Sequence, residues 1–144
     1  MPKDDVLELK QKAKELRKQI IEVVYKAQSG HPGGSLSEID MLVALYNHKL
    51  KIDPKNPKWE DRDRFILSKG HASPGLYVVL ADKGFFPKSE LGKFRQLNGM
   101  LQGHPELSIP GVEFAAGALG QGLSFALGIA LAARLDNKNY NVYA

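Results

Sequence analysis

Three of the four histidines in this 144-residue chain directly follow a glycine. They are His31, His71 and His104, and each lies in a segment whose glycines and prolines predict a loop. Near neutral pH an imidazole can move protons on hydroxyl groups and can donate hydrogen bonds to phosphate or to a developing oxyanion. A neighbouring glycine lets another group approach the backbone closely. Together the three motifs favour one site for a polyhydroxy or phosphorylated small molecule.

Other chemistries fit these residues less well. Taken alone, each of these three histidines could have only a structural role, as a residue that forms a hydrogen bond within its turn. The fourth, His48, lies inside a predicted helix and is expected to be exposed. A zinc site is disfavoured because the sequence has no His-x-x-x-His pair, the spacing that one helix face presents to a metal. None of the serines lies in a Gly-x-Ser-x-Gly elbow. Cysteine is absent, which excludes disulfides, thiolate metal sites and cysteine nucleophiles.

A glycine-rich segment, Gly117-Ala118-Leu119-Gly120-Gln121-Gly122, precedes a predicted helix of small residues. Its glycine spacing is the reverse of the dinucleotide-binding fingerprint, so we do not expect that ligand. Small residues permit close helix packing. The segment therefore predicts either tight packing alone or a backbone surface that a flat ligand contacts.

The hydrophobic pattern predicts the elements that would position these loops. Residues 4–28 read as an amphipathic helix, because apolar residues recur at steps of three and four. The glycines and proline of residues 29–35 end it. A second, largely buried helix begins at Ser35, with Glu38 completing a capping box, and runs to about residue 50.

The rest of the chain predicts an alternation of strand and helix. The remaining predicted elements are a polar loop over 51–63, a buried parallel strand over 64–68, a helix from the N-cap Ser73 to Gly84, a short helix over 88–97, a loop over 98–111, a helix ending near Leu135, a turn over 136–141 and a strand beginning near Val142. This order predicts an α/β fold of layers, a parallel sheet with flanking helices. We expect residues 1–144 to form one domain that is incomplete at its C-terminus.

Composition excludes several function classes. There are 20 basic and 16 acidic side chains, spread along the chain, so no basic arm or patch indicates a nucleic-acid partner. Residues 114–133 carry no charge and are long enough to span a bilayer. Their glycines and polar residues favour a helix buried on all sides in a water-soluble protein instead, so we expect no membrane partner. The N-terminus has no apolar signal region, and a cytoplasmic location is expected.

Four motifs, in this order, resemble the transketolase family. They are Ser29-Gly30-His31-Pro32-Gly33-Gly34, Leu67-Ser68-Lys69-Gly70-His71 with Tyr77, Gly103-His104-Pro105-Glu106, and the Gly117–Gly122 segment. The resemblance begins near residue 5 and is to the N-terminal part of the diphosphate-binding domain, with the N-terminal subunits of split transketolases as the nearer form. It implies a thiamine diphosphate-binding fold and transfer of a two-carbon ketol unit between sugar phosphates, as in the pentose phosphate pathway.

The resemblance also implies roles for single residues. His31 and His104 match histidines that contact the substrate, so both are implied to be catalytic and substrate-binding. His71 matches a histidine at the cofactor diphosphate. Gly117, Ala118 and Leu119 match the segment that meets the cofactor rings. Many relatives have proline at position 118, and alanine leaves the loop less rigid.

Other parts of such a site are expected outside these residues. The Gly-Asp-Gly motif that binds the divalent metal, Mg or Ca, would follow the strand at Val142, so no metal ligand is expected in this chain. The glutamate that activates thiamine lies in another domain. We therefore expect the 144 residues alone to be inactive. They would need a C-terminal portion carrying the pyrimidine domain, within a dimer or another homo- or hetero-oligomer.

Three alternatives stay open. A deoxyxylulose-phosphate synthase is a related thiamine enzyme. A homologue could act on a different sugar, as sulfosugar or apulose transketolases do. A non-catalytic interaction module would use the helix at 4–28 as a docking surface, although docking does not require three Gly-His loops.

Overall fold

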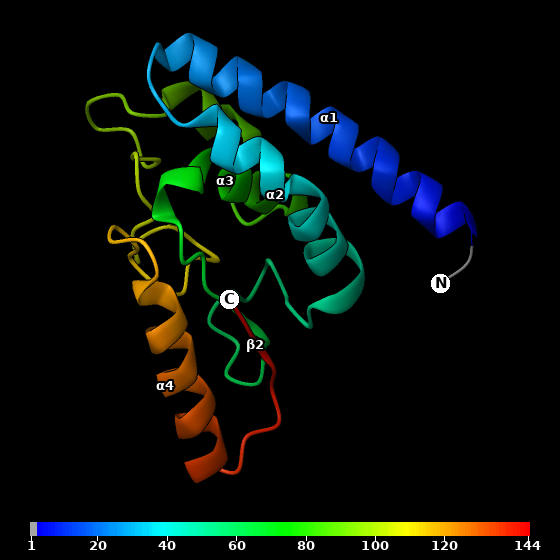
Figure 1. Ribbon diagram of the computed structural model, residues 1–144, viewed down its shortest axis with the longest axis vertical. Coiled ribbons are helices and arrows are strands. Elements are labelled where there is room, and N and C mark those ends of the chain that lie inside the picture. Colours follow the sequence, from blue (N-terminus) through cyan, green and yellow to red (C-terminus); the bar gives the residue numbers. More distant parts are fainter. Residues whose placement is uncertain (1–2) are drawn as a thin grey trace.

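Helices dominate the structure, and two short strands lie beside them (Figure 1). The computed structural model describes residues 3–144. In chain order the elements are α1 (Lys3–Ala27), α2 (Pro32–Ala44), a π-helical turn (Leu45–Lys49), β1 (Arg64–Phe65), a 3-10 turn (Gly70–Ala72), α3 (Ser73–Lys83), a 3-10 helix (Lys88–Lys93), α4 (Gln121–Leu135) and β2 (Val142–Tyr143). The predicted combination of helices with a small parallel sheet is confirmed.

α1 is the amphipathic helix predicted over residues 4–28. It packs on α2 and α3, and these three helices form one layer (Figure 1). The buried residues of its apolar stripe are Ala13, Leu16, Ile20 and Val23. Each large apolar side chain buried in this way contributes about 1.5–3 kcal/mol to folding. The stripe therefore anchors α1 to the core of this chain.

α2 begins at Pro32, earlier than the predicted start at Ser35. Proline suits the first turn of a helix, because it lacks an N–H that would need a partner there and its φ is already helical. Gly33 and Gly34 follow within the helix, so the prediction that they lie in a loop is wrong. The early start places His31 at the N-cap position, directly before the first residue of the helix.

The predicted capping box at the start of α2 is also wrong. No side chain caps this helix, and Ser35 and Glu38 are buried within it instead. The helix is less buried than predicted as well. Ile39 and Leu42 lie in the core, but Met41 is 62% exposed because no described segment covers that face.

The strands β1 and β2 are parallel neighbours, so the predicted parallel sheet is present. The predicted buried strand over 64–68 is wrong in extent: β1 ends at Phe65 and is half-buried, and the buried Ile66 and Leu67 follow it outside the strand. Arg64 pairs with Val142 and Phe65 with Tyr143. Asp63, which is 2% exposed, fixes this register. Its carboxylate accepts hydrogen bonds from the backbone N–H of Asn141 at 2.7 Å and of Lys51 at 2.9 Å.

α3 packs against both α1 and α2 and is buried from Ser73 to Ala81. Its predicted C-terminus at Gly84 is confirmed, with φ of 87° in the left-handed region that glycine tolerates. Its predicted N-cap is wrong: Ser73 lies inside the helix, and Ala72, at the end of the 3-10 turn, precedes it. The predicted helix over 88–97 is the shorter 3-10 helix.

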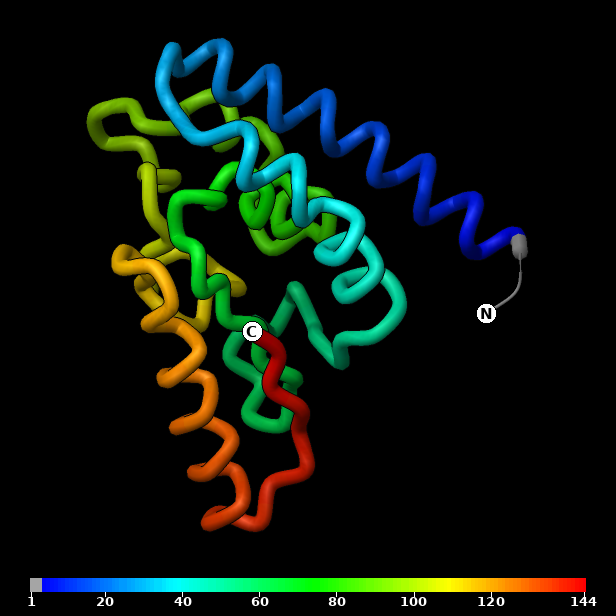
Figure 2. The backbone as a smooth tube through the Cα atoms, in the orientation of Figure 1, coloured from blue at the N-terminus to red at the C-terminus, as the bar shows by residue number. Residues whose placement is uncertain are grey.

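α4 lies apart from the three-helix layer, on the other side of the strands (Figure 2). It contacts β2, and only its small residues Gly122, Ala126 and Ala133 are buried. Leu123 is 66% exposed and Leu127 61% exposed. The prediction that this helix is buried on all sides is therefore wrong for residues 3–144. Over those residues, no helix combines the length and apolar character needed to span a bilayer.

Candidate functional site

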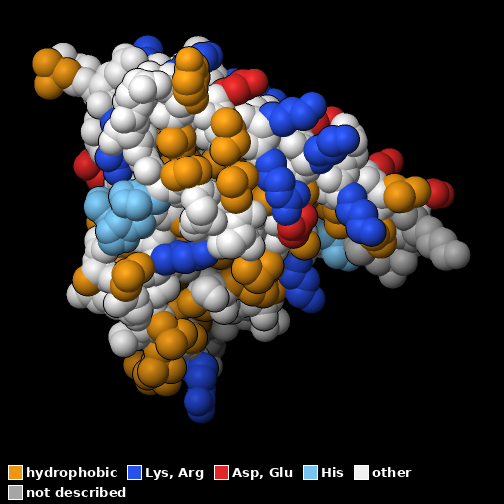
Figure 3. Space-filling model, turned by 45° about the horizontal axis from the view of Figure 1, so that its top comes forward, with side chains coloured by type: hydrophobic (Ala, Val, Ile, Leu, Met, Phe, Trp, Pro, Cys, Tyr) orange, Lys and Arg blue, Asp and Glu red, His pale blue; other side chains and the backbone are white. Residues whose placement is uncertain are grey.

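The three histidines that follow a glycine meet at one place. The ring centroids of His31 and His71 are 5.1 Å apart, and those of His71 and His104 are 4.6 Å apart. Both pairs meet edge to face, with interplanar angles of 86° and 80°. The space-filling view shows a patch of histidine side chains at the surface (Figure 3). The central prediction of the sequence, that these imidazoles converge, is confirmed.

His31 and His71 are placed by the ends of two elements. His31 directly precedes α2, and His71 lies in the 3-10 turn that follows β1. The backbone at Gly70 touches another segment there: a Cβ placed on Gly70 would lie only 2.1 Å from the carbonyl oxygen of Ala116. Glycine is therefore required at position 70 for the histidine loop to reach the segment leading to Gly117.

His104 is held by α3. Ser73 Oγ donates a hydrogen bond to the carbonyl oxygen of Gly103 at 2.9 Å. The Tyr77 hydroxyl lies 3.0 Å from the carbonyl oxygen of His104 and 2.9 Å from that of Gln102, to which it donates its proton. Ser73 and Tyr77 are four residues apart on one face of α3, which is the spacing at which two side chains of a helix point the same way.

Arg95 joins the loops from the other side. Its Nη1 donates a hydrogen bond to Ser29 Oγ at 2.6 Å. A Cβ on Gly103 would lie 2.7 Å from Arg95 Nη2, so the glycine before His104 leaves room for the guanidinium. Arg95 thereby connects the start of the His31 loop with the His104 loop.

The electrostatic setting favours neutral imidazole at His104. Burial lowers the pKa of His104, and the nearby His71, Arg95 and His31 lower it further. Two ring nitrogens in the cluster, His71 Nδ1 and His104 Nε2, are buried and have no hydrogen-bond partner among the described residues. Buried polar atoms nearly always have a partner in a folded protein. These two nitrogens are therefore suited to bind the polar groups of a ligand.

The Gly117–Leu119 segment presents backbone to solvent beside this cluster. Gly117, Ala118 and Leu119 are exposed, and a Cβ on Gly117 or Gly120 would meet nothing within 4 Å. The next glycine differs: a Cβ on Gly122 would lie 2.7 Å from the Cα of Ser68. The segment therefore combines the two roles that its sequence allows, since Gly122 serves tight packing and the residues before it are open to a flat ligand.

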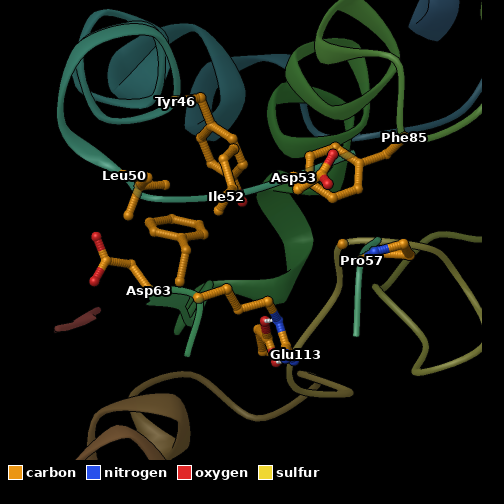
Figure 4. Close-up of a pocket in the computed structure, with 11 residues that line it drawn as sticks. Tyr46, Leu50, Ile52, Asp53, Pro57, Asp63, Phe85 and Glu113 are labelled. Carbon is orange, nitrogen blue, oxygen red and sulfur yellow. Dashed lines mark hydrogen bonds and ion pairs between the residues drawn. The ribbon is translucent and has the colours of Figure 1, made fainter. Parts of the chain in front are cut away.

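Another pocket, shown in Figure 4, lies among residues of a different part of the fold. It has room for about one water molecule, with a volume of about 10 Å³. Its charged side chains already have partners: Arg62, for example, donates two hydrogen bonds of 2.7 Å to the Glu113 carboxylate. This pocket surrounds a structural ion pair at the edge of the core, and none of the predicted site residues lines it.

Within residues 3–144, no three histidine, aspartate or glutamate side chains are grouped to hold a cation. The expectation that the metal of the site is bound by residues outside this chain stays a prediction.

Sequence reasoning missed several residues that build the site. Arg95 carried no signal, because its partners Ser29 and Gly103 are remote in sequence. Ser73 and Ser35 read as helix caps, although their hydroxyls hold loops from other segments. One sequence signal was available for the residues that hold the His104 loop. Ser73 and Tyr77 have i, i+4 spacing directly after the histidine turn, which places both side chains on one face of a helix.

Comparison with known proteins gives a consistent result. Residues 9–143 match the family described as "Transketolase, thiamine diphosphate binding domain". The chain is 44% identical over 127 residues to one of the subunits of the apulose-4-phosphate transketolase of Phocaeicola vulgatus, covering 88% of this chain and 45% of that relative. It is 43% identical over 138 residues to the 6-deoxy-6-sulfo-D-fructose transketolase subunit SqwG of a Clostridium species, covering 95% of this chain and 50% of that relative.

The fold is also similar to solved structures. The crystal structure of transketolase from Campylobacter jejuni superimposes with a TM-score of 0.88 at 42% sequence identity, over 94% of this chain and 22% of that one. The chain therefore spans about half the length of each of the two split relatives and about a fifth of the longer enzyme.

Proposed function

Because the chain belongs to the transketolase family, through its thiamine diphosphate binding domain, we propose that it forms the N-terminal part of a transketolase. In this role it contributes about half of a cofactor site, and the activity requires the rest of the assembly. The observation that carries the proposal is the meeting of His31, His71 and His104 in one cluster.

The residues present fit thiamine diphosphate. The unpartnered His71 Nδ1 can donate or accept a hydrogen bond, which suits a diphosphate oxygen or a water bound to it. The exposed backbone of Gly117, Ala118 and Leu119 suits the flat rings. When bound, thiamine diphosphate supplies the nucleophilic carbon and the electron sink that carbon–carbon bond cleavage needs.

The remaining two histidines act on the sugar. His31 and His104 orient hydroxyl groups of the donor and exchange protons with them. Because the pKa of His104 is lowered, its ring is neutral near pH 7, and Nε2 is free to accept a hydroxyl proton. His104 is thus suited to act as a base and His31 as a positioning donor or acid.

The assembly that we propose contains the parts this chain lacks. A divalent metal, Mg or Ca, is bound by residues outside the 144 present here. A C-terminal portion carries the pyrimidine domain, and the site is completed in a dimer or a hetero-oligomer in the cytoplasm. The share of its relatives that the chain spans supports this arrangement.

The sugar substrate has more than one candidate. The two split relatives described above are named for apulose 4-phosphate and for 6-deoxy-6-sulfo-D-fructose. Longer relatives are named only as transketolases, such as that of Buchnera aphidicola at 48% identity. We propose sugar phosphates as the substrate class, with pentose phosphates and apulose 4-phosphate as the members to compare. The sulfonated sugar 6-deoxy-6-sulfo-D-fructose, which has no phosphate, is the alternative outside that class.

The test combines this chain with the rest of its polypeptide or with its partner protein and measures ketol transfer with each candidate donor. We expect transfer from the combination in the presence of thiamine diphosphate and Mg²⁺, and none from the 144 residues alone. Activity from the chain alone would contradict the proposal. Transfer that survives alanine at His31, His71 and His104 together would favour a non-catalytic interaction module.

A further inference from the structure

Two side chains of the helix that follows His31 bind the loop that carries His71. Ser35 and Glu38 share one face of α2, because residues three to four apart lie one helical turn from each other. Ser35 Oγ donates a hydrogen bond to the carbonyl oxygen of Ala72 at 3.2 Å. Glu38 Oε2 lies 3.1 Å from Lys69 Nζ. Since Lys69 and Ala72 lie on either side of His71 in the chain, α2 holds the histidine loop at both of its ends.

The ammonium group of Lys69 is fully engaged by α2. Besides Glu38, its Nζ donates to the carbonyl oxygen of Gly34 at 3.2 Å and to Ser37 Oγ at 3.2 Å. An ammonium group has three donors, and each has an acceptor on this one helix. Lys69 is therefore fixed in position relative to α2 although its side chain is 41% exposed.

Glu38 depends on this partner. It is 4% exposed, and burial raises its pKa while the hydrogen bond and the charge of Lys69 act in the opposite direction. Removing Lys69 would leave the Glu38 carboxylate as a buried charge that neither water nor protein stabilises. The Glu38 carboxylate and the Lys69 ammonium group therefore depend on each other, and we treat them as one interaction.

Stability alone does not explain a carboxylate at position 38. Glu38 Oε1 is buried and has no hydrogen-bond partner among residues 3–144. A Cβ on Gly75 would lie 3.3 Å from this oxygen, so α3 packs closely over it. Apolar residues of similar volume often replace a buried ion pair at no loss of stability. A specific geometric role accounts for the charged pair better.

We propose that Glu38, acting through Lys69, is a positioning residue that holds the His71 ring against His31. This inference concerns the arrangement of the histidines, and it rests on the proposed function only where it assigns His71 to the cofactor. Loss of the pair would leave Lys69 only its hydrogen bonds to Gly34 and Ser37, and would loosen one end of the 3-10 turn at Gly70–Ala72. Ser35 would still hold the other end.

The first test uses the full chain and does not require activity. Glu38→Gln keeps the side-chain volume and removes the charge. We expect the nuclear Overhauser contact between the His31 and His71 ring protons to fall by more than half. Asp40→Asn is the matched control, because Asp40 pairs with Arg17 on an exposed face of the same helix. It should leave the contact unchanged. An unchanged contact in folded Glu38→Gln would overturn the proposal.

A second variant keeps the test decisive if Glu38→Gln does not fold. Lys69→Met removes the partner from a half-exposed position and should weaken the same contact. The double variant Glu38→Gln/Lys69→Met leaves no unpaired charge in the core and should fold. It should show no greater loss of the contact than Lys69→Met, because the two residues act as a unit. A double variant with the full contact between the rings would contradict the positioning role.

The second readout separates this inference from the proposed function. In the assembled protein, Glu38→Gln should weaken thiamine diphosphate binding by about tenfold, the change in affinity that corresponds to the loss of about one hydrogen bond. Loss of the ring contact with unchanged cofactor affinity would support the positioning role and count against the assignment of His71 to the cofactor.

Discussion

His104 combines a lowered pKa with a ring nitrogen that has no partner among the described residues. Both follow from its place over α3, where Ser73 and Tyr77 hold the backbone and His71 stands 4.6 Å from its ring centroid. Burial and neighbouring positive or partly positive groups disfavour the imidazolium form. A neutral imidazole at this position can accept a proton from a hydroxyl group of a sugar.

The titration of His104 is the first prediction. We expect its ring to titrate below about 6.5, the ordinary value for histidine. Replacing His71 by alanine should raise the pKa of His104, because it removes a neighbour that opposes protonation. Because the pKa of His104 is lower in the folded protein than in the unfolded chain, the unfolded chain binds more protons than the folded protein when the pH falls below about 6.5. The contribution of His104 to stability is therefore present above about pH 6.5 and is lost as the pH falls. NMR of the ring carbon signals measures both changes; titration above the ordinary value would contradict the account.

The second prediction concerns His31. In the assembled protein, His31→Ala should lower kcat by about 100-fold, the usual size of a lost proton-transfer or positioning group. His48→Ala is the control, because His48 is exposed in the turn after α2 and is not one of the candidate site residues. Steady-state ketol transfer measures both. Equal losses in the two variants would show that His31 has no special role.

At the scale of elements, glycines decide how closely the segments of the site approach. Two glycines near the site differ in what surrounds them. A Cβ on Gly70 would lie 2.1 Å from a backbone oxygen of Ala116, whereas a Cβ on Gly33 would meet nothing within 4 Å. A backbone atom cannot move aside as the end of a long side chain can. The two positions therefore form a matched pair for an alanine substitution.

The third prediction uses that pair. Gly70→Ala should lower the free energy of unfolding by about 3 kcal/mol, at the upper end of the cost of overpacking. Gly33→Ala, in the first turn of α2, should raise it by about 0.5 kcal/mol, because alanine favours a helix over glycine. Urea unfolding of both variants measures the difference. A Gly70→Ala chain as stable as the original would contradict the contact with Ala116.

The elements that periodicity defines could be predicted from the sequence. The helix at α1, the end of α3 at Gly84 and the presence of strands near Arg64 and Val142 follow from local residue patterns. The pairing of these two strands does not. The predicted start of α2 is three residues late and the predicted N-cap of α3 is one residue late, because Ser35 and Ser73 resemble N-caps. Their hydroxyls bind carbonyl groups of other segments instead, and such partners are not visible in a linear sequence.

The candidate site divides in the same way. The convergence of three imidazoles could be predicted, because the same Gly-His pair recurs in three segments whose glycines and prolines predict loops. The residues that support them could not. Arg95 and Lys69 act across the fold on Ser29 and Glu38, and no periodic pattern connects positions that far apart.

For the whole molecule, one buried carboxylate reinforces the backbone pairing that joins the last strand to the middle of the chain. Asp63 accepts hydrogen bonds from Lys51 and Asn141, so it fixes both the loop after α2 and the segment leading into β2. α4, which precedes β2 in the chain and contacts it, leaves several leucines exposed. Among the polar side chains in residues 3–144 that hold the segment from α4 to β2 in place, Asp63 is the most buried. We therefore expect the placement of this segment to depend strongly on Asp63.

The fourth prediction follows from this dependence. The Asp63 carboxylate accepts hydrogen bonds with both of its oxygens. In Asp63→Asn one oxygen becomes an NH₂ group, which would face a backbone N–H and could not accept a hydrogen bond from it. We expect the free energy of unfolding to fall by about 2 kcal/mol and hydrogen exchange to quicken first in β2. Asp61→Asn, which affects an exposed ion pair with Lys138, should change stability by less than about 0.5 kcal/mol. Similar effects of the two substitutions would contradict the role of Asp63.

The central claim is that three histidines from separate loops form one side of a thiamine diphosphate site. Its most direct test follows the four imidazole signals by NMR while thiamine diphosphate and Mg²⁺ are added to the assembled protein. We predict that the signals of His31, His71 and His104 shift together along one saturation curve and that the signal of His48 does not shift. Saturable cofactor binding that leaves the three clustered histidines unchanged would contradict it.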